Sequence, residues 1–243
     1  VTVLTVAGPA NKIVKKSKSG KITKEASPPI AEATAVTVRV STQAEMVELL
    51  KAIGSHEERV LCLGYVPGTE PGPDERVGDQ FKFISQKRMG KALGVDPETA
   101  EGLEAILGWH EVNGEQCICR LKVNMLASSW CLIDIDAAEG MPDHLAKLDG
   151  AGRREKLAEV IPGFADCGLV MLPSTTGRVL NDGVPLDATG EHLYLQLQDP
   201  SDLERFGAVL LQHSTLKGYG FQKPIKDKKT REVIGTSASS IAD

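Results

Sequence analysis

The chain has 243 residues, of which 41% are hydrophobic and 25% are charged, a composition typical of a globular protein. No apolar run approaches the ~20 residues that a helix needs to cross a bilayer, so no membrane partner is expected. Only 4% of the residues are aromatic, which argues against a surface that stacks nucleobases, and the net charge of −5 by itself argues against nucleic acid as a partner.

A β-α-β unit is expected early in the chain, after a weak strand and a basic turn within residues 1–35. Valines alternate with polar residues over 36–40, which predicts a strand. Thr42 and Glu45 have the spacing of a capping box and predict a helix that ends at Gly54. The apolar run 59–66 then predicts a buried strand.

The remaining segments continue this alternation. Helices are expected over about 84–93, 97–108, 142–161 and 201–217, strands over 116–123, 130–136, 168–172 and 191–198, and a hairpin in the C-terminal stretch. The last helix is expected to begin at a second capping box, Ser201 with Glu204. The alternation favours an α/β or α+β fold with a mixed β-sheet.

Basic residues gather in two segments. Residues 12–24 contain six lysines and no acidic residue, and residues 217–231 contain five lysines and one arginine against Asp227. Two basic segments on an acidic body favour a surface that follows the phosphates of a nucleic acid. The alternative is that both segments are solvated loops.

The five cysteines are an odd number and fall mostly in expected strands. This usage argues for reduced thiols in the core and an intracellular, cytoplasmic protein. Cys117 and Cys119 form the only close pair, and no histidine stands at a zinc-finger spacing, so structural zinc is not expected.

Two aspartates two residues apart on an apolar strand are the most informative feature. Side chains at i and i+2 share one face of a strand, so Asp134 and Asp136 project together while Ile133 and Ile135 point into the core. Two close carboxylates repel each other unless a counter-charge is present, and Mg²⁺ or Mn²⁺ is the usual one. The alternative is a strand end that exposes both carboxylates to water.

The strand 191–198 is expected to have one packed and one polar face. Its leucines share the packed face, and His192, Tyr194, Gln196 and Gln198 share the polar one. A histidine at the head of the polar face can donate a hydrogen bond to a phosphate oxygen. The alternative is a surface histidine on an ordinary amphipathic strand.

Two further segments carry candidate ligands. The turn after the strand 168–172 holds Ser174, Thr176 and Arg178, whose hydroxyls and guanidinium can bind phosphates. Asp243 ends a short apolar run and is a candidate third metal ligand.

The order of these motifs resembles the catalytic core of the archaeo-eukaryotic primase superfamily, the primase-polymerases. The motifs are Ile133-Asp134-Ile135-Asp136, a strand and turn with small polar residues, Gly190-Glu-His192-Leu-Tyr194, and Ile241-Ala242-Asp243. The runs 199–207 and 216–221 are also similar to members of this group on plasmids and integrative elements. The resemblance covers roughly residues 125–243.

The resemblance implies a mixed central β-sheet of the RRM-like palm type, flanked by helices and preceded by a smaller α/β unit. We expect a single primase-polymerase-like domain over 1–243. Its first part is an N-terminal α/β module with a basic arm over 1–125, and its second is a metal-binding catalytic module over 126–243.

The implied activity is DNA primase or primase-polymerase synthesis by two-metal nucleotidyl transfer. Asp134, Asp136 and Asp243 would hold two Mg²⁺ or Mn²⁺ ions. His192 would bind the triphosphate, with Arg178 and Lys223 as helpers. The residue two before His192 is Gly190, not Ser, so Ser174 or Thr176 supplies the family's hydroxyl, or no residue does.

The implied partners are a single-stranded DNA template, nucleoside triphosphates and a replicative helicase, in the replication of a plasmid or mobile element. Two alternatives stay open. One is a metal-dependent phosphodiesterase or nuclease, for which Asp143 and His144 are the additional candidate ligands near Asp134. The other is a non-catalytic replication initiator or nucleic-acid-binding domain on the same fold.

Overall fold

The structure, a computed structural model, describes most of the chain. It describes residues 1–8, 13–16, 22–25, 30–73, 78–136, 138–173, 180–181, 184–185, 190–227, 230 and 232–241, with the backbone alone at 13–16, 22–25, 180–181 and 184–185. The chain forms two compact units, Val1–Ser128 and Ser129–Asp243. That they act as one catalytic domain stays a prediction.

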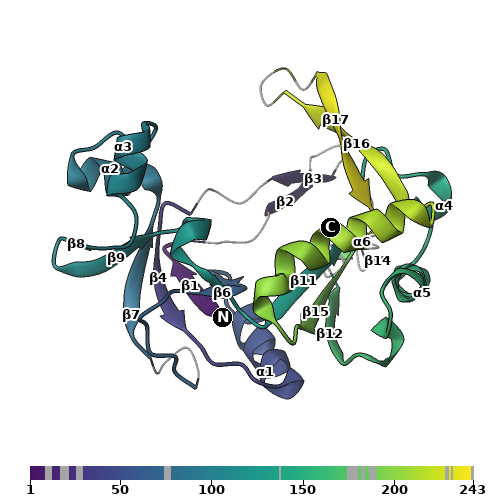
Figure 1. Ribbon diagram of the computed structural model, residues 1–243, viewed down its shortest axis with the longest axis horizontal. Coiled ribbons are helices and arrows are strands. Elements are labelled where there is room, and N and C mark those ends of the chain that lie inside the picture. The colour runs from purple at the N-terminus through teal and green to yellow at the C-terminus, as the bar shows by residue number, and fades with distance from the viewer. Residues whose placement is uncertain are drawn as a thin grey trace. The chain divides into compact units, whose positions relative to one another are not determined.

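The first unit is built on a six-stranded sheet, whose strands run in the order β5-β1-β4-β7-β9-β8 (Figure 1). These strands are β1 (Thr2–Val6), β4 (Glu32–Thr37), β5 (Arg59–Cys62), β7 (Gln80–Ile84), β8 (Trp109–Val112) and β9 (Glu115–Cys119). Strands β7 and β9 are parallel, and the other neighbours are antiparallel. The expected fold class, α/β with a mixed sheet flanked by helices, is therefore confirmed.

The predicted β-α-β unit forms around α1 (Gln43–Gly54), although its first strand, β4, covers Glu32–Thr37 and not the expected 36–40. The Thr42 hydroxyl accepts a hydrogen bond from the Glu45 amide, and the Glu45 carboxylate accepts one from the Thr42 amide, so the predicted capping box is present. Strands β4 and β5 do not pair, because β1 lies between them and pairs antiparallel with both.

The expected strand over 59–66 is two strands. Strand β5 ends at Cys62, and β6 (Gly64–Tyr65) pairs with β10 (Leu126–Ala127). At Gly64 a Cβ atom would lie 3.1 Å from the Leu126 carbonyl oxygen, so the missing side chain permits this close approach. The chain therefore stops pairing with β1 before Gly64 and pairs with β10 from Gly64 onward.

Short helices complete the second half of the first unit. They are α2 (Gln86–Leu93), α3 (Ala100–Ala105) and a 3₁₀ helix (Lys122–Asn124). Helix α3 is shorter than the expected 97–108, because the Thr99 side chain caps it by accepting a hydrogen bond from Gly102. Strand β9 likewise ends at Cys119, before the expected end at 123.

Apolar side chains pack on both faces of the six-stranded sheet. One cluster includes Leu4, Phe81 and Phe83, and the other includes Ile84 and Met89 with the thiols of the cysteine pair. All five cysteines are free. A separate hairpin of β2 (Ile13–Lys16) and β3 (Ile22–Glu25) carries part of the first basic segment.

The second unit contains a three-stranded antiparallel sheet in the order β11-β15-β12. The strands of this sheet are β11 (Trp130–Ile135), β12 (Leu169–Pro173) and β15 (Glu191–Gln196). The helices of the unit are α4 (Asp143–Ala146), α5 (Gly150–Val160), α6 (Leu203–Leu216) and two 3₁₀ helices (Phe164–Asp166 and Pro200–Asp202). The remaining strands of the unit are β13 (Leu180–Asn181), β14 (Val184–Pro185), β16 (Gly220–Lys226) and β17 (Val233–Ser240). Strands β16 and β17 form the expected C-terminal hairpin.

The main elements of this unit follow the order β11-α5-β12-β15-α6-β16, a β-α-β-β-α-β sequence. The third strand, β15, lies between the first and the second, as in a split β-α-β arrangement. The mixed six-stranded sheet lies in the first unit, whereas the strand that carries Asp134 belongs to this smaller antiparallel sheet.

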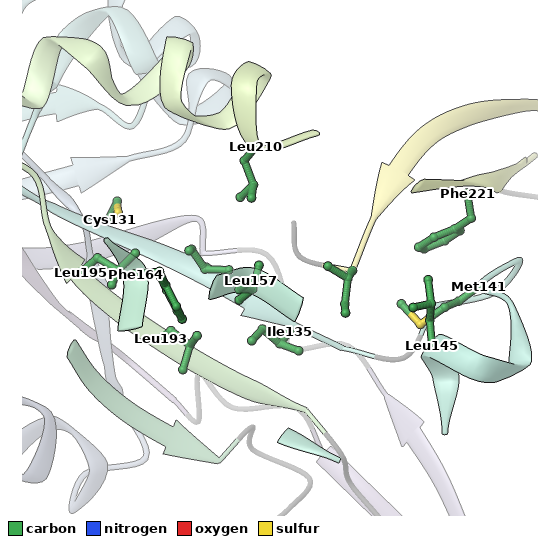
Figure 2. Packing of buried hydrophobic residues seen from close by; sticks show 12 residues of the cluster. Cys131, Ile135, Met141, Leu145, Leu157, Phe164, Leu193, Leu195, Leu210 and Phe221 are labelled. Atoms are coloured by element: carbon green, nitrogen blue, oxygen red, sulfur yellow. The ribbon is translucent and has the colours of Figure 1, made fainter. Parts of the chain in front are cut away.

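Helices α5 and α6 cover one face of the three-stranded sheet (Figure 1). Leu157 of α5 and Leu210 of α6 belong to a buried cluster that also contains Ile133, Ile135 and Leu193 of the sheet. Figure 2 shows Ile135, Leu157 and Leu193 converging in this cluster. The cluster fixes which face of β11 and β15 points toward the helices.

Two helices of the second unit differ from the prediction in where they begin. The helix expected over 142–161 is divided into α4 and α5, because the Asp149 side chain accepts a hydrogen bond from the Gly152 amide at 2.8 Å and starts a new helix. The capping box expected at Ser201 is wrong. Asp199 accepts hydrogen bonds from the amide and hydroxyl of Ser201 and caps a 3₁₀ helix, after which α6 begins at Leu203.

Candidate functional site

Asp134 and His192 lie directly opposite each other on neighbouring strands. They are partners in the antiparallel register of β11 and β15, and the His192 Nε2 atom is 3.4 Å from the Asp134 Oδ1 atom. Both side chains are partly exposed, His192 at 29% and Asp134 at 44%. Two residues that are 58 positions apart in the chain therefore form one polar site on the sheet.

The site lies on the sheet face that points away from α5 and α6. Ile133 and Ile135 flank Asp134 in sequence, are exposed by only 2% and 0%, and pack into the core with the helices. Because strand side chains alternate, Asp134 must point to the opposite face. On β15, His192, Tyr194 and Gln196 share that face, as the leucine alternation predicts. The face is not wholly polar, because Tyr194 is buried.

Asp136 follows the last residue of β11 and has a buried cation within electrostatic reach. Arg153 of α5 is fully buried, and its Nη2 atom donates to the Ala146 carbonyl oxygen at 3.3 Å. Burial lowers the pKa of the Arg153 guanidinium, whereas the negative charges of Asp136 and Glu191 raise it. A buried guanidinium needs such counter-charges, so Arg153 joins α5 electrostatically to the candidate site.

Glu191 connects the first turn of α5 to the strand that carries His192. Its Oε2 atom accepts from Arg154 Nη1 at 2.5 Å. A Cβ atom at Gly150 would lie 2.1 Å from Glu191 Oε1, so the carboxylate rests against the start of α5 where only glycine leaves room. The helix thus holds the backbone next to His192.

Sequence reasoning missed this second layer of charges. Arg153 stands four residues before Leu157, a spacing that places both on the same face of a helix. The helical period was therefore the signal that could have found Arg153. The proximity of Glu191 to α5 had no such signal, because it depends on how the sheet and the helix pack.

Several predicted site residues are not brought together with Asp134 and His192 by the described part of the structure. Four of them lie outside the described residues: Ser174, Thr176, Arg178 and Asp243. Lys223 lies on the exposed part of β16. The roles of all five stay predictions.

The hairpin that carries Lys223 is fastened to the loop after β11. Lys226 Nζ lies 2.6 Å from Glu139 Oε2, and a Cβ atom at Gly140 would lie 2.3 Å from the Gln222 carbonyl oxygen. Lys226, one of the cations of the second basic segment, is therefore already neutralised by an acidic side chain.

A divalent cation needs several oxygen or nitrogen ligands that lie close together. Among the described residues, no group of three or more His, Cys, Asp and Glu side chains is close enough to hold a metal ion. Asp134 on β11 and Asp136 directly after it are hard oxygen ligands of the kind that Mg²⁺ and Mn²⁺ prefer. They fit part of a divalent-metal site, and a third ligand has to come from outside the described segments.

In the segments that the structure describes, no helix has the length and apolar character to cross a bilayer. Comparison with protein-family models, curated proteins and solved structures gave no match to this chain. The feature that bears on function is therefore the site itself, an aspartate opposite a histidine on the helix-free face of an antiparallel sheet.

Proposed function

We propose that the chain is a DNA primase or primase-polymerase that makes or extends primers on a single-stranded DNA template. One observation carries the proposal. Asp134 and His192 face each other across β11 and β15, on the face of a β-α-β-β-α-β unit that its helices leave free. This pairing supports a site in which a metal ligand and a phosphate ligand act on the same nucleotide.

Asp134 and Asp136, with Asp243 as the third ligand, would hold two Mg²⁺ or Mn²⁺ ions. When bound, these ions lower the pKa of the attacking 3′-hydroxyl and neutralise charge on the triphosphate and the departing pyrophosphate. The chain's own part is positioning, because phosphoryl transfer requires little other chemistry from side chains.

His192 would donate a hydrogen bond to a triphosphate oxygen. Its Nε2 atom is 3.4 Å from the Asp134 carboxylate, so a phosphate held by His192 lies within reach of a cation held by Asp134. Ser174 or Thr176 would add a hydroxyl, and Arg178 and Lys223 would add positive charge. Glu191 and Arg154 would keep the β15 backbone beside His192 in place.

The two basic segments would follow the backbone of the template, since the low aromatic content favours phosphate contacts over base stacking. The further partners are nucleoside triphosphates and a replicative helicase. The cellular role is replication of a plasmid or mobile element in the cytoplasm.

Replacement of Asp134 tests the proposal. Purified chain is incubated with a primed single-stranded template, labelled nucleotides and Mn²⁺. Asp134→Asn should reduce incorporation by ~100-fold or more, because even residues that only support metal ligands cost 10–100-fold. The matched control is Asp166→Asn, which changes an exposed carboxylate of the 3₁₀ helix Phe164–Asp166.

The control should synthesise at the wild-type rate, and both variants should show wild-type thermal unfolding. Synthesis that survives in Asp134→Asn, or that is absent from the wild-type chain, contradicts the proposal. Cleavage of the template without synthesis would instead select the nuclease alternative.

One observation favours the non-catalytic alternative, a nucleic-acid-binding or initiator domain. Each aspartate of the site has a cationic or ionisable neighbour within the protein, His192 beside Asp134 and Arg153 near Asp136. Both carboxylates can therefore be compensated without a metal. Template binding that is unchanged by Mn²⁺, together with no incorporation, would select this alternative.

A further inference from the structure

A second candidate site lies in the first unit, on the sheet and separate from Asp134 and His192. A cavity of about 690 Å³ is lined by side chains from β4, β7, β8, β9 and α2. This volume is within the ~300–1,000 Å³ of typical small-molecule sites. The lining is rich in charged groups of both signs, and their arrangement indicates what the cavity can bind.

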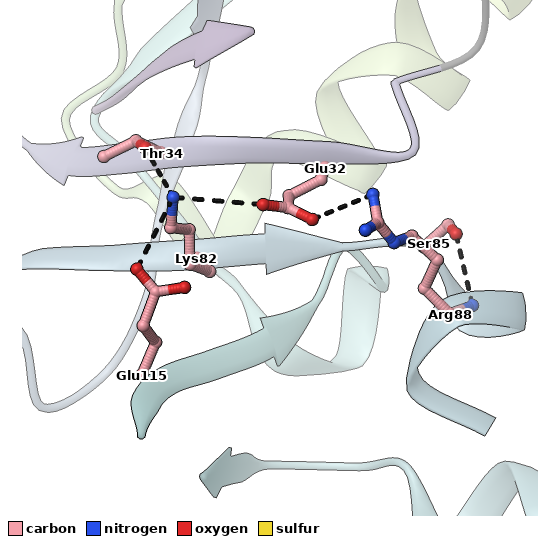
Figure 3. A network of polar contacts seen from close by, with 6 residues as sticks. All are labelled: Glu32, Thr34, Lys82, Ser85, Arg88 and Glu115. Atoms are coloured by element: carbon pink, nitrogen blue, oxygen red, sulfur yellow. Dashed lines mark hydrogen bonds and ion pairs between the residues drawn. The ribbon is translucent and has the colours of Figure 1, made fainter. Parts of the chain in front are cut away.

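Lys82 provides a cation on the sheet side of the cavity (Figure 3). Its Nζ atom donates to Thr34 Oγ1 at 3.1 Å, while the carboxylates of Glu115 and Glu32 are farther away, at 3.6 and 3.9 Å. An ammonium group has three donors, and among the described residues only Thr34 is within hydrogen-bonding distance of Lys82 Nζ. Lys82, with a side chain 23% exposed, therefore retains donors for a ligand.

Helix α2 provides a basic wall. Arg88 and Lys91 are three residues apart and share one side of the helix. Arg88 Nη1 lies 2.8 Å from Glu32 Oε2, which uses part of a guanidinium that has five donors (Figure 3). Lys91 has no ion pair with any residue that the structure describes. Both cations can donate to an anion in the cavity.

The hairpin of β8 and β9 provides an acidic wall. Glu111 and Glu115 line the cavity from this hairpin, and Asn113 lines it from the turn between them. Carboxylates accept hydrogen bonds from hydroxyl and amino groups, as acidic residues do with ribose in dinucleotide sites. A ligand that fits both walls has an anionic group at one end and hydrogen-bond donors at the other.

We infer that this cavity binds a small phosphorylated molecule that carries hydroxyl groups, such as a sugar phosphate or a nucleoside monophosphate. Lys91 and the remaining donors of Arg88 hold the phosphate, for which charge-assisted hydrogen bonds from Lys and Arg are suited. Lys82, at 3.6 Å from Glu115 and 3.9 Å from Glu32, lies between the two walls. Glu111 and Glu115 accept hydrogen bonds from the sugar hydroxyls. The inference does not depend on the proposed polymerase activity.

Calorimetric titration of the full chain in metal-free buffer tests the inference. The probes are ribose 5-phosphate, adenosine monophosphate, inorganic phosphate and ribose. We expect saturable binding of the two phosphorylated sugars, weaker binding of phosphate and none of ribose. Binding of adenosine monophosphate tighter than ribose 5-phosphate identifies a nucleotide, and equal binding identifies a sugar phosphate.

Two variants test the contribution of the basic wall and of the acidic wall separately. Lys91→Met should weaken all phosphorylated probes by about tenfold, the effect of one charge-assisted hydrogen bond. Glu111→Gln should weaken ribose 5-phosphate but leave inorganic phosphate unchanged. The matched control is Lys87→Met, which removes an exposed lysine of the same helix that does not line the cavity.

Asp134→Asn is a second control and should bind ribose 5-phosphate like the wild type, which separates this cavity from the candidate polymerase site. The inference is overturned if no phosphorylated probe saturates, or if Lys87→Met weakens binding as much as Lys91→Met. It is also overturned if Asp134→Asn abolishes binding.

Discussion

At the scale of single residues, the candidate site contains two layers of charge. Asp134 and His192 form the outer layer, on the helix-free face of the sheet. Arg153 and Glu191 form the inner layer, on the side of α5. The outer layer could be predicted from strand alternation, whereas the pairing of Asp134 with His192 required the strand register, which the sequence does not encode locally.

Removal of the buried guanidinium should destabilise the second unit. In Arg153→Met, the hydrogen bond to the Ala146 carbonyl oxygen is lost and Asp136 loses its nearby cation, whereas Glu191 keeps Arg154. We therefore expect the free energy of unfolding to fall by about 2 kcal/mol. Urea denaturation followed by circular dichroism measures the change. The control is Arg205→Met, because Arg205 is 72% exposed in a surface pair with Asp202 and should cost less than ~1 kcal/mol. Equal losses would contradict a buried ionic role for Arg153.

Buried thiols should make stability fall at alkaline pH. Burial raises the pKa of Cys119 and of Cys131 from 9.0 to about 11. The unfolded chain therefore loses these protons near pH 9, while the folded chain keeps them to about pH 11, so stability is fully present below pH 9 and declines between the two values.

Comparison of the wild type with Cys119→Ala at pH 7.5 and pH 10.5 measures this contribution. The substitution removes the titrating thiol, so the wild type's advantage in free energy of unfolding should be smaller at the higher pH. An advantage that is constant or larger at pH 10.5 would show that the Cys119 thiol does not titrate as its burial predicts.

At the scale of elements, boundaries were less predictable than the elements themselves. The capping box at Thr42 was predicted correctly, because all of its partners lie within four residues. The break at Gly64 and the division of the helix expected over 142–161 were not predicted. At Gly64 the chain leaves the six-stranded sheet and pairs with a strand about sixty residues further along. The start of α5 depends on a single aspartate cap at Asp149.

This cap gives a prediction for α5. Asp149→Ala removes the acceptor for the Gly152 amide and should lower the free energy of unfolding by about 1 kcal/mol. The control is Asp143→Ala, in which an exposed i,i+4 pair with Lys147 is lost at little cost. Chemical denaturation checks both variants, and equal effects would show that α5 does not depend on its cap.

At the scale of the whole molecule, composition and alternation were sufficient for the fold class. They could not say which unit carries the mixed sheet, since strand order depends on contacts between segments far apart in the chain. The weak N-terminal strand illustrates this limit. It lies inside the six-stranded sheet, between β5 and β4, with Val3 and Leu4 buried. Pairing with two strands far along the chain decides this place, and the strand's own residues do not encode it.

The interior place of β1 has a consequence for refolding. Thr2 pairs with Thr37 on one side and with Cys62 on the other, so both ladders of this strand close long loops. Such closures lose chain entropy before they gain any contact, which slows folding and keeps apolar segments exposed for longer. We therefore expect a diluted, denatured chain to regain the local hairpins quickly and the first sheet last, with aggregation as the competing outcome at high protein concentration.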